Sequence, residues 1–398
     1  MDLTQLLAFA MQNKASDLHL SPGNPPIIRV HGSLRRIKVD SVLTSDDIRA
    51  MVYSVMSEQQ RAEYEKDMET DFAISFGEKA RFRVNAFTTR NGSSAVFRTI
   101  PSEIPTIEEL DLPPVVTRFA ELEKGLILVT GATGSGKSTT LAAILNHINT
   151  NHDKHIISIE DPVEFFHHSK KSLVNHREVG RDTLSFAKAL RSALREDPDV
   201  LLVGELRDYE TMSLALTAAE TGHLVLATLH ANTSPKAIDR MIDVFPTGDK
   251  PMARTMLASS LQAVITQNLV KRADGSGRVG VFEILVGTNA VRNLIRENQI
   301  PQMLSMIQTG SRYGMVTMEE YCQNLVQQGV ISKDEARAVM MEVSEDTDDR
   351  SEGYTAAALG GRKMPGKDAP KQPVAAAPAR KEQKETDEGS SDGGGYSF

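Results

Sequence analysis

The chain has 398 residues, of which 40% are hydrophobic and 25% are charged, as in a soluble globular protein with room for two or three domains. Its net charge of -8 argues against nucleic acid as the main substrate. The single cysteine, Cys322, excludes an intramolecular disulfide and any zinc site made of several cysteines, and it favours a reducing compartment.

The first hundred residues predict a small α+β domain. The start lacks the pattern of a signal peptide, and no apolar run of about 18 residues occurs, so we expect a cytoplasmic protein. Apolar residues at helical spacing predict a helix from Leu3 to about Asn13, and Thr44 with Asp47 predicts the start of a second helix. Strands are predicted at 17–20, 27–30, 34–37, 72–76, 80–87 and 95–100.

A different pattern begins after the prolines of segment 101–114, which we interpret as a linker and hinge. Short apolar strands then alternate with helices, which indicates an α/β domain at 115–344 with a parallel sheet covered on both faces. The expected strands are 126–130, 155–159, 200–203, 224–228 and 279–285, and the expected helices include 186–194 and 252–269.

The last segment, 345–398, is acidic at first and then rich in Ala, Pro, Gly, Lys and Glu. Such a composition buries too little apolar area to offset the entropy of ordering the chain. We expect a disordered tail, which would be either an interaction arm or a solvated extension.

The stretch GATGSGKST lies between the apolar run 126–129 and a helical pattern. A buried strand, a glycine-rich turn and a helix start in this order predict a phosphate-binding loop, with an ordinary strand-to-helix turn as the alternative. Lys137 would reach the outer phosphates of the ligand, and the hydroxyl of Ser138 would bind Mg²⁺. The residues expected to bind nucleotide are Gly131, Ala132, Thr133, Gly134, Ser135, Gly136, Lys137, Ser138 and Thr139.

Two other predicted strands are followed by acidic residues. Glu205 follows strand 200–203 in the manner of the acid that steers Mg²⁺ or the attacking water. Glu164 follows strand 155–159 and would accept a proton from that water. Ligands of open parallel sheets bind beyond the carboxyl ends of the strands, where both residues fall. The alternative for each is a solvated loop carboxylate.

Two histidines bracket the predicted strand 224–228. His230 follows the strand and would lie near the γ-phosphate, whereas His223 precedes it. On chemistry alone, a single histidine at a strand end is more often structural.

Four segments, 131–138, 157–164, 199–205 and 221–230, resemble in order and spacing the Walker A, Asp box, Walker B and His box of the secretion ATPase superfamily, which drives type II secretion and type IV pili. Segments 190–198, 214–220 and 290–297 are similar to those of the pilus retraction ATPases, although Val291 stands where their usual form has Ile. The resemblance covers about residues 1–340.

This resemblance implies a hexameric ring in which a PAS-like N-terminal domain lies across a RecA-like P-loop core. It implies that Lys137 binds phosphate, that Ser138 and Glu205 bind Mg²⁺, and that Glu164 is the catalytic base. It also gives His223 and His230 the roles of the family's histidine pair. Arginines of the N-terminal domain complete the site in this family, and the candidates here are Arg81, Arg83 and Arg98.

The function implied is that of an ATP-hydrolysing motor for pilus retraction and twitching motility. Its partners would be other copies of the chain, a platform protein of the inner membrane and a paralogous retraction ATPase, at the cytoplasmic base of the pilus and without nucleic acid. The alternatives are the accessory retraction paralogue and an extension or type II secretion ATPase, although members of the last group typically carry a four-cysteine zinc motif that this chain lacks. A nucleic-acid motor and a scaffold that binds ATP without hydrolysis are more distant alternatives.

Overall fold

A computed structural model describes residues 2–30, 32–39, 42–77, 80–100 and 104–345. Its strands form two sheets, one of six strands and one of seven. The tail predicted at 345–398 lies outside these residues except for Glu345, which ends the last helix. Residues 101–103 of the predicted linker also lie outside them.

The first sheet is antiparallel and contains all the strands before residue 101. They are β1 (Asp17–Leu20), β2 (Ile27–Val30), β3 (Ser33–Arg36), β4 (Glu69–Phe76), β5 (Ala80–Thr89) and β6 (Gly92–Ile100), in the order β3-β2-β1-β6-β5-β4. The strands predicted at 27–30 and 34–37 are present as β2 and β3, which pair as an antiparallel hairpin. Alternate residues of β5, such as Phe82 and Val84, are fully buried, because one face of the sheet carries the core.

Three helices accompany this sheet: α1 (Leu3–Gln12), α2 (Ser45–Tyr53) and α3 (Glu58–Asp67). The predicted start of α2 is confirmed, since the Thr44 hydroxyl accepts from the Asp47 backbone and the Asp47 carboxylate accepts from the Thr44 backbone. Helix α3 was not predicted, because it lacks an apolar stripe and Tyr64 is its only buried residue. A capping box formed by Ser57 and Gln60 marks its start.

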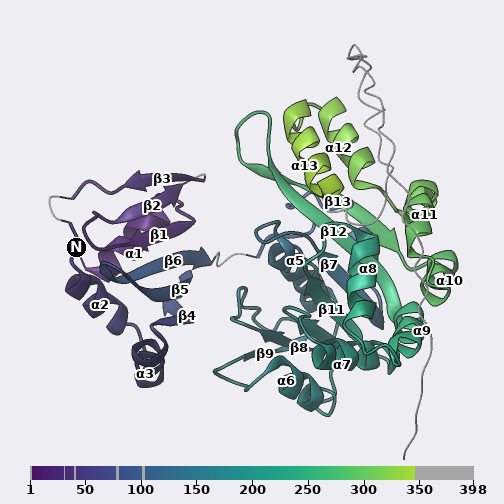
Figure 1. Ribbon diagram of the computed structural model, residues 1–398, viewed down its shortest axis with the longest axis horizontal. Helices are drawn as coiled ribbons and strands as arrows, with labels where there is room; N and C mark the ends of the chain where they lie inside the picture. Colours follow the sequence, from purple (N-terminus) through teal and green to yellow (C-terminus); the bar gives the residue numbers. More distant parts are fainter. Residues whose placement is uncertain (1, 31, 40–41, 78–79, 101–103, 346–398) are drawn as a thin grey trace, which may run out of the picture. The chain divides into compact units, whose positions relative to one another are not determined.

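The second sheet consists of β7 (Gly125–Thr130), β8 (His155–Glu160), β9 (Leu173–Glu178), β10 (Val200–Val203), β11 (Leu224–Leu229), β12 (Leu261–Lys271) and β13 (Arg278–Val286). Their order is β13-β12-β7-β11-β10-β8-β9 (Figure 1). All neighbouring pairs from β12 to β9 are parallel, and β13 adds an antiparallel edge. The predicted parallel sheet is therefore present, except that the predicted strand 279–285 forms β13 and runs antiparallel to β12.

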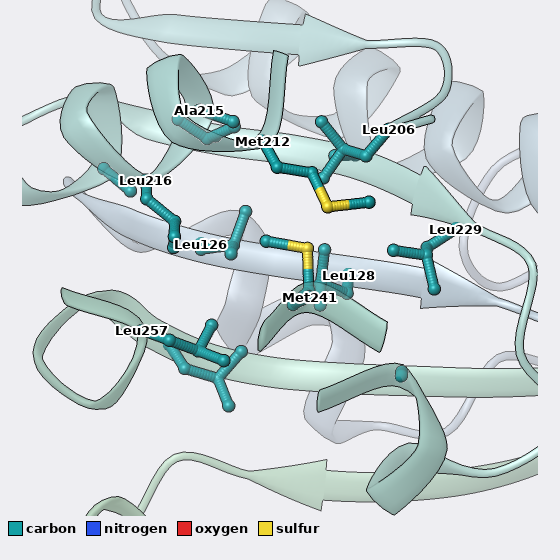
Figure 2. Packing of buried hydrophobic residues seen from close by; sticks show 14 of the residues in the cluster. Leu126, Leu128, Leu206, Met212, Ala215, Leu216, Leu229, Met241 and Leu257 are labelled. Atoms are coloured by element: carbon teal, nitrogen blue, oxygen red, sulfur yellow. The ribbon is translucent and has the colours of Figure 1, made fainter. Parts of the chain in front are cut away.

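Helices cover both faces of this sheet. They are α4 (Val115–Ala120), α5 (Lys137–Asn151), α6 (Phe186–Ala193), α7 (Tyr209–Glu220), α8 (Ser234–Asp243) and α9 (Lys250–Ser260). Leu126 and Leu128 of β7 point to the face packed by α7, α8 and α9, where Figure 2 shows them near Met212 and Met241. The intervening Ile127 packs on the other face with residues of α4 and α5.

The segment 252–269, predicted as one helix, is half helix and half strand. Helix α9 ends at Ser260 and β12 begins at the next residue. The prediction was wrong for 261–269 because non-local pairing decides the conformation: β12 pairs with β7 on one side and with β13 on the other. Strand β9 was also missed, and its mostly exposed or half-exposed residues explain why its apolar pattern is weak.

The chain continues through α10 (Asn289–Arg296), η1 (Ile300–Gln302), α11 (Met303–Thr309), η2 (Ser311–Tyr313), α12 (Met318–Gln327) and α13 (Lys333–Glu345). Cys322 of α12 is buried, and this burial raises the pKa of its thiol to about 11, so the thiol stays protonated near neutral pH. Within the described ranges no helix combines the length and apolarity needed to cross a bilayer.

Candidate active site

The backbone of the predicted phosphate loop depends on glycine. Gly131, Gly134 and Gly136 all have positive φ, at 141°, 82° and 91°. A Cβ atom at Gly131 would collide with the carbonyl of Gln267. The loop then enters α5 at Lys137, so the positive end of the helix dipole faces the loop.

Gln267 of β12 holds this loop from the far side, and sequence reasoning missed it. Its side chain is buried, with Nε2 donating to the Ser135 carbonyl at 2.5 Å and Oε1 accepting from the Thr140 hydroxyl at 2.8 Å. The two bonds join the loop to the first turns of α5. The only sequence signal was a polar residue within an apolar strand, in a segment predicted to be helical.

Lys137 is buried inside the loop that it follows. Its Nζ donates to the carbonyls of Gly131 and Ala132, both at 2.9 Å. Burial lowers the pKa of the ammonium, while the charges of Glu205 and Glu164 act in the opposite direction. These opposing effects show that both predicted acidic residues lie within electrostatic reach of the lysine.

Glu205 lies beyond the end of β10, in contact with Arg207 and His230. Its Oε2 accepts from Arg207 Nη2 at 2.7 Å, and its Oε1 lies 3.4 Å from His230 Nε2. Burial raises the pKa of this carboxyl, but the hydrogen bond and charge of Arg207, with the charges of His230 and Lys137, outweigh burial and leave the pKa below its usual range. Glu205 is therefore ionised at neutral pH. Arg207 was not singled out from the sequence.

His230 follows β11, as the sequence predicted, and its imidazole lies next to Glu205. Arg240 of α8 donates to its backbone carbonyl at 2.9 Å and fixes the turn. Burial, followed by the charge of Lys137, lowers the pKa of the imidazole, so it is mainly neutral near pH 7.

His223 lies at the other end of β11. Its Nδ1 is 2.9 Å from the Ala218 carbonyl, and the strand places it about 20 Å from His230 along the chain. Phosphates held by the loop of the same chain are out of its reach, so the structure does not bring the two histidines together.

Glu164 follows β8, and its side chain is 40% exposed. Its Oε1 lies 3.8 Å from Nη1 of Arg83, which also makes a two-pronged hydrogen bond with Asp71. Arg81 lies over the ring of Phe166 at 5.8 Å. Arg98 instead donates to Asp17 at 2.9 Å, so Arg81 and Arg83 approach this segment and Arg98 does not.

A buried set of polar groups connects the strands under the loop. The Thr266 hydroxyl of β12 lies 2.8 Å from that of Thr130 and 3.2 Å from that of Ser234. The Ser234 backbone N–H, at the start of α8, donates to the Glu283 carboxyl at 2.7 Å. The hydroxyl of Ser135, in the loop itself, is buried without a hydrogen-bond partner among the residues described here, which fits a loop that takes up ligand oxygens.

The model of the family described as "Type II/IV secretion system protein" matches residues 1–345. The chain belongs to this family. It is 56% identical over 337 residues to the "Type IV pilus retractation ATPase PilT" of Pseudomonas aeruginosa, which covers 85% of this chain and 97% of that protein. It is 40% identical over 338 residues to the "Type IV pilus ATPase PilU" of the same organism, with 85% and 88% covered.

A comparison with solved structures agrees with this family assignment. The "Crystal Structure of the Pilus Retraction Motor PilT and Bound ADP" matches with a TM-score of 0.79 and 44% identity over 85% of this chain and 97% of that one. The family and the mixed α/β fold predicted from the sequence are therefore confirmed. The roles of individual residues and the domain limits 1–100, 101–114 and 115–344 stay predictions.

Proposed function

We propose that this chain hydrolyses ATP and that the reaction drives retraction of a type IV pilus. One observation carries the catalytic part: the phosphate loop, His230, Glu205 and Glu164 follow β7, β11, β10 and β8, which are consecutive neighbours in the parallel sheet. Their side chains thus belong to the carboxyl edge, where sheets of this type bind nucleotides.

In this proposal the loop N–H groups and Lys137 bind the phosphates. Glu164, which is partly exposed, takes a proton from the attacking water, and the ionised Glu205 orients that water. His230 lies against Glu205 and responds to the γ-phosphate as a neutral imidazole. Arg83 stabilises charge on the transferred phosphoryl group, because its link to Asp71 orients its guanidinium.

Mg²⁺ fits two oxygen donors of the site, one in the first turn of α5 and one beyond the end of β10. The Ser138 hydroxyl and the Glu205 carboxylate are hard oxygen ligands, and Glu205 is ionised as a metal ligand must be. When bound, Mg²⁺ would offset the charge of the phosphates.

In the cell, this motor would act as a homohexamer at the cytoplasmic face of the pilus base. A PAS-like domain at 1–100, a hinge at 101–114 and a core at 115–344 would convert hydrolysis into movement against an inner-membrane platform protein. The identity to PilT, over nearly the whole of that protein, supports retraction and exceeds the identity to PilU.

The catalytic part is tested by ATPase assays of the purified chain. Lys137→Ala should abolish hydrolysis and weaken ATP binding, because it removes the phosphate ligand. Glu164→Gln should abolish turnover but keep binding of a fluorescent ATP analogue, whereas Glu58→Gln on the exposed face of α3 should change neither. Full turnover by Lys137→Ala would mean that the site is assigned wrongly, and loss of binding in Glu164→Gln would make Glu164 structural.

The cellular part is tested by counting surface pili in cells that lack the gene, with wild-type and Lys137→Ala copies returned to them. Excess pili and lost surface motility, restored only by the wild-type copy, are expected. Bald cells would mean that the chain drives extension, and an unchanged count would mean an accessory or secretion role. ATPase activity should not respond to added DNA or RNA, since a response would favour a nucleic-acid motor.

A further inference from the structure

Glu121, His147 and His152 lie together at the end of α5 that is remote from the phosphate loop. His147 is in the last turns of the helix, His152 is its C-cap, and Glu121 follows α4 directly. Glu121 Oε1 lies 2.9 Å from His147 Nε2, and Glu121 Oε2 lies 3.1 Å from His152 Nε2. Because α5 has fifteen residues, this cluster lies about 20 Å from Lys137.

The donor atoms have the spacing of a metal-binding set. One atom from each side chain lies within 4.8 Å of the other two. Ligands at about 2.1 Å from a tetrahedral zinc ion are about 3.4 Å apart, so small rotations of the side chains would bring all three to that geometry. Two imidazoles and one carboxylate favour zinc and its neighbours over Mg²⁺ or Ca²⁺.

The state of each group also suits a cation. His152 Nε2 is buried and, in the described ranges, has no partner in hydrogen-bond geometry, although the Glu121 carboxylate is close. The C-terminal end of α5 contributes a partial negative charge at the same point. The side chains of His147, His152 and Glu121 are 20%, 31% and 48% exposed, so a metal ion can reach them from solvent.

We propose that Glu121, His147 and His152 bind one zinc ion, with the fourth position open to water. The ion would link the segment that follows α4 to the far end of the helix that carries the phosphate loop. The single cysteine of the chain excludes only zinc sites built from several cysteines. Neither His147 nor His152 takes part in the proposed ATP reaction.

The test is a calorimetric titration of Zn²⁺ into the full-length, nucleotide-free protein, which is first treated with a chelator to remove bound metal. Cobalt spectra of the same samples would report the ligand geometry. We expect one equivalent of Zn²⁺ per chain at this site. His147→Ala and His152→Ala should each weaken its binding by at least about tenfold, because each removes one of three ligands. His168→Ala removes an exposed imidazole elsewhere and should bind Zn²⁺ like the wild type.

Circular dichroism without metal shows whether the variants fold, since these side chains are partly exposed. If the wild type takes up no Zn²⁺, or if all four proteins bind it equally, the proposal is wrong, and the cluster is then only a set of ion pairs. ATPase activity with Mg²⁺ is a separate readout, so failure of this proposal would leave the proposed reaction untouched.

Discussion

Gln267 ties the phosphate loop to a strand that begins more than 120 residues after it. Replacing it with alanine leaves the Ser135 carbonyl and the Thr140 hydroxyl without this partner in a buried place, which costs about 1–3 kcal/mol. We expect Gln267→Ala to weaken ATP binding at least about fivefold, measured with a fluorescent analogue. Gln262→Ala changes the same strand away from the loop and is the control. Equal affinities for ATP would show that the loop keeps its shape without Gln267.

Protonation of His167 should lower the stability of the fold in acid. Burial, followed by the charges of His176 and Lys170, lowers its pKa to about 3. In the unfolded chain His167 takes up a proton near pH 6.5, whereas in the folded chain it stays neutral down to about pH 3. The free energy of unfolding therefore decreases as the pH falls below about 6.5. The loss from this residue alone reaches about 2 kcal/mol at pH 5.

His167→Phe removes this titration. The urea midpoint of the wild type should fall between pH 7.5 and pH 5.0 by clearly more than that of the variant. His168→Ala, which changes the exposed neighbour, should show the wild-type difference. Identical pH dependence in His167→Phe would mean that His167 is charged in the folded protein.

A carboxyl group lies in the core where β13 contacts the start of α8. Glu283 is almost fully buried and accepts from the backbone of Ser234, the first residue of α8. Burial raises its pKa, against the hydrogen bonds from Ser234. Above about pH 4.5 the Glu283 carboxyl ionises more readily in the unfolded chain than in the folded one, so the free energy of unfolding decreases as the pH rises.

Glu283→Gln should raise the melting temperature at pH 7.5, because its amide oxygen keeps the bond to Ser234 and the desolvation cost of a carboxylate disappears. Glu283→Leu should lower it, since the Ser234 N–H then loses its partner. A loss of stability in Glu283→Gln as large as that in Glu283→Leu would show that the charge itself holds the start of α8.

Elements with local signals were predictable, and those fixed by distant pairing were not. The phosphate loop was readable because its glycines, Lys137 and the flanking strand are contiguous. The strand β12 was not, because no Gly or Pro separates Ser260 from Leu261 and its neighbours β7 and β13 determine its conformation. Gln267 was missed for the same reason, because only the fold brings it near Ser135 and Thr140. Arg207 is different: its partner Glu205 is two residues away, so its place beside a predicted site residue was a local signal.

At the scale of the whole molecule, the family match and α13 both end at residue 345. A chain that stops after Glu345 should therefore keep the wild-type kcat and the wild-type KM for ATP, measured in parallel steady-state assays. A lower kcat in the shortened chain would mean that residues beyond 345 contribute to turnover. The motility assay on the same two forms would then separate a role in catalysis from one in docking.

The two hydrogen bonds of Gln267 also affect when the phosphate loop can take its final shape during translation. The predicted phosphate loop is translated well before β12, so a nascent chain contains all the glycines of this loop before it contains Gln267. The loop can therefore make both bonds to Gln267 only after residue 267 has been translated. Fragments that end before residue 267 contain the whole phosphate loop but lack Gln267, which holds the loop in shape. We therefore expect such fragments to bind nucleotide more weakly than the full chain.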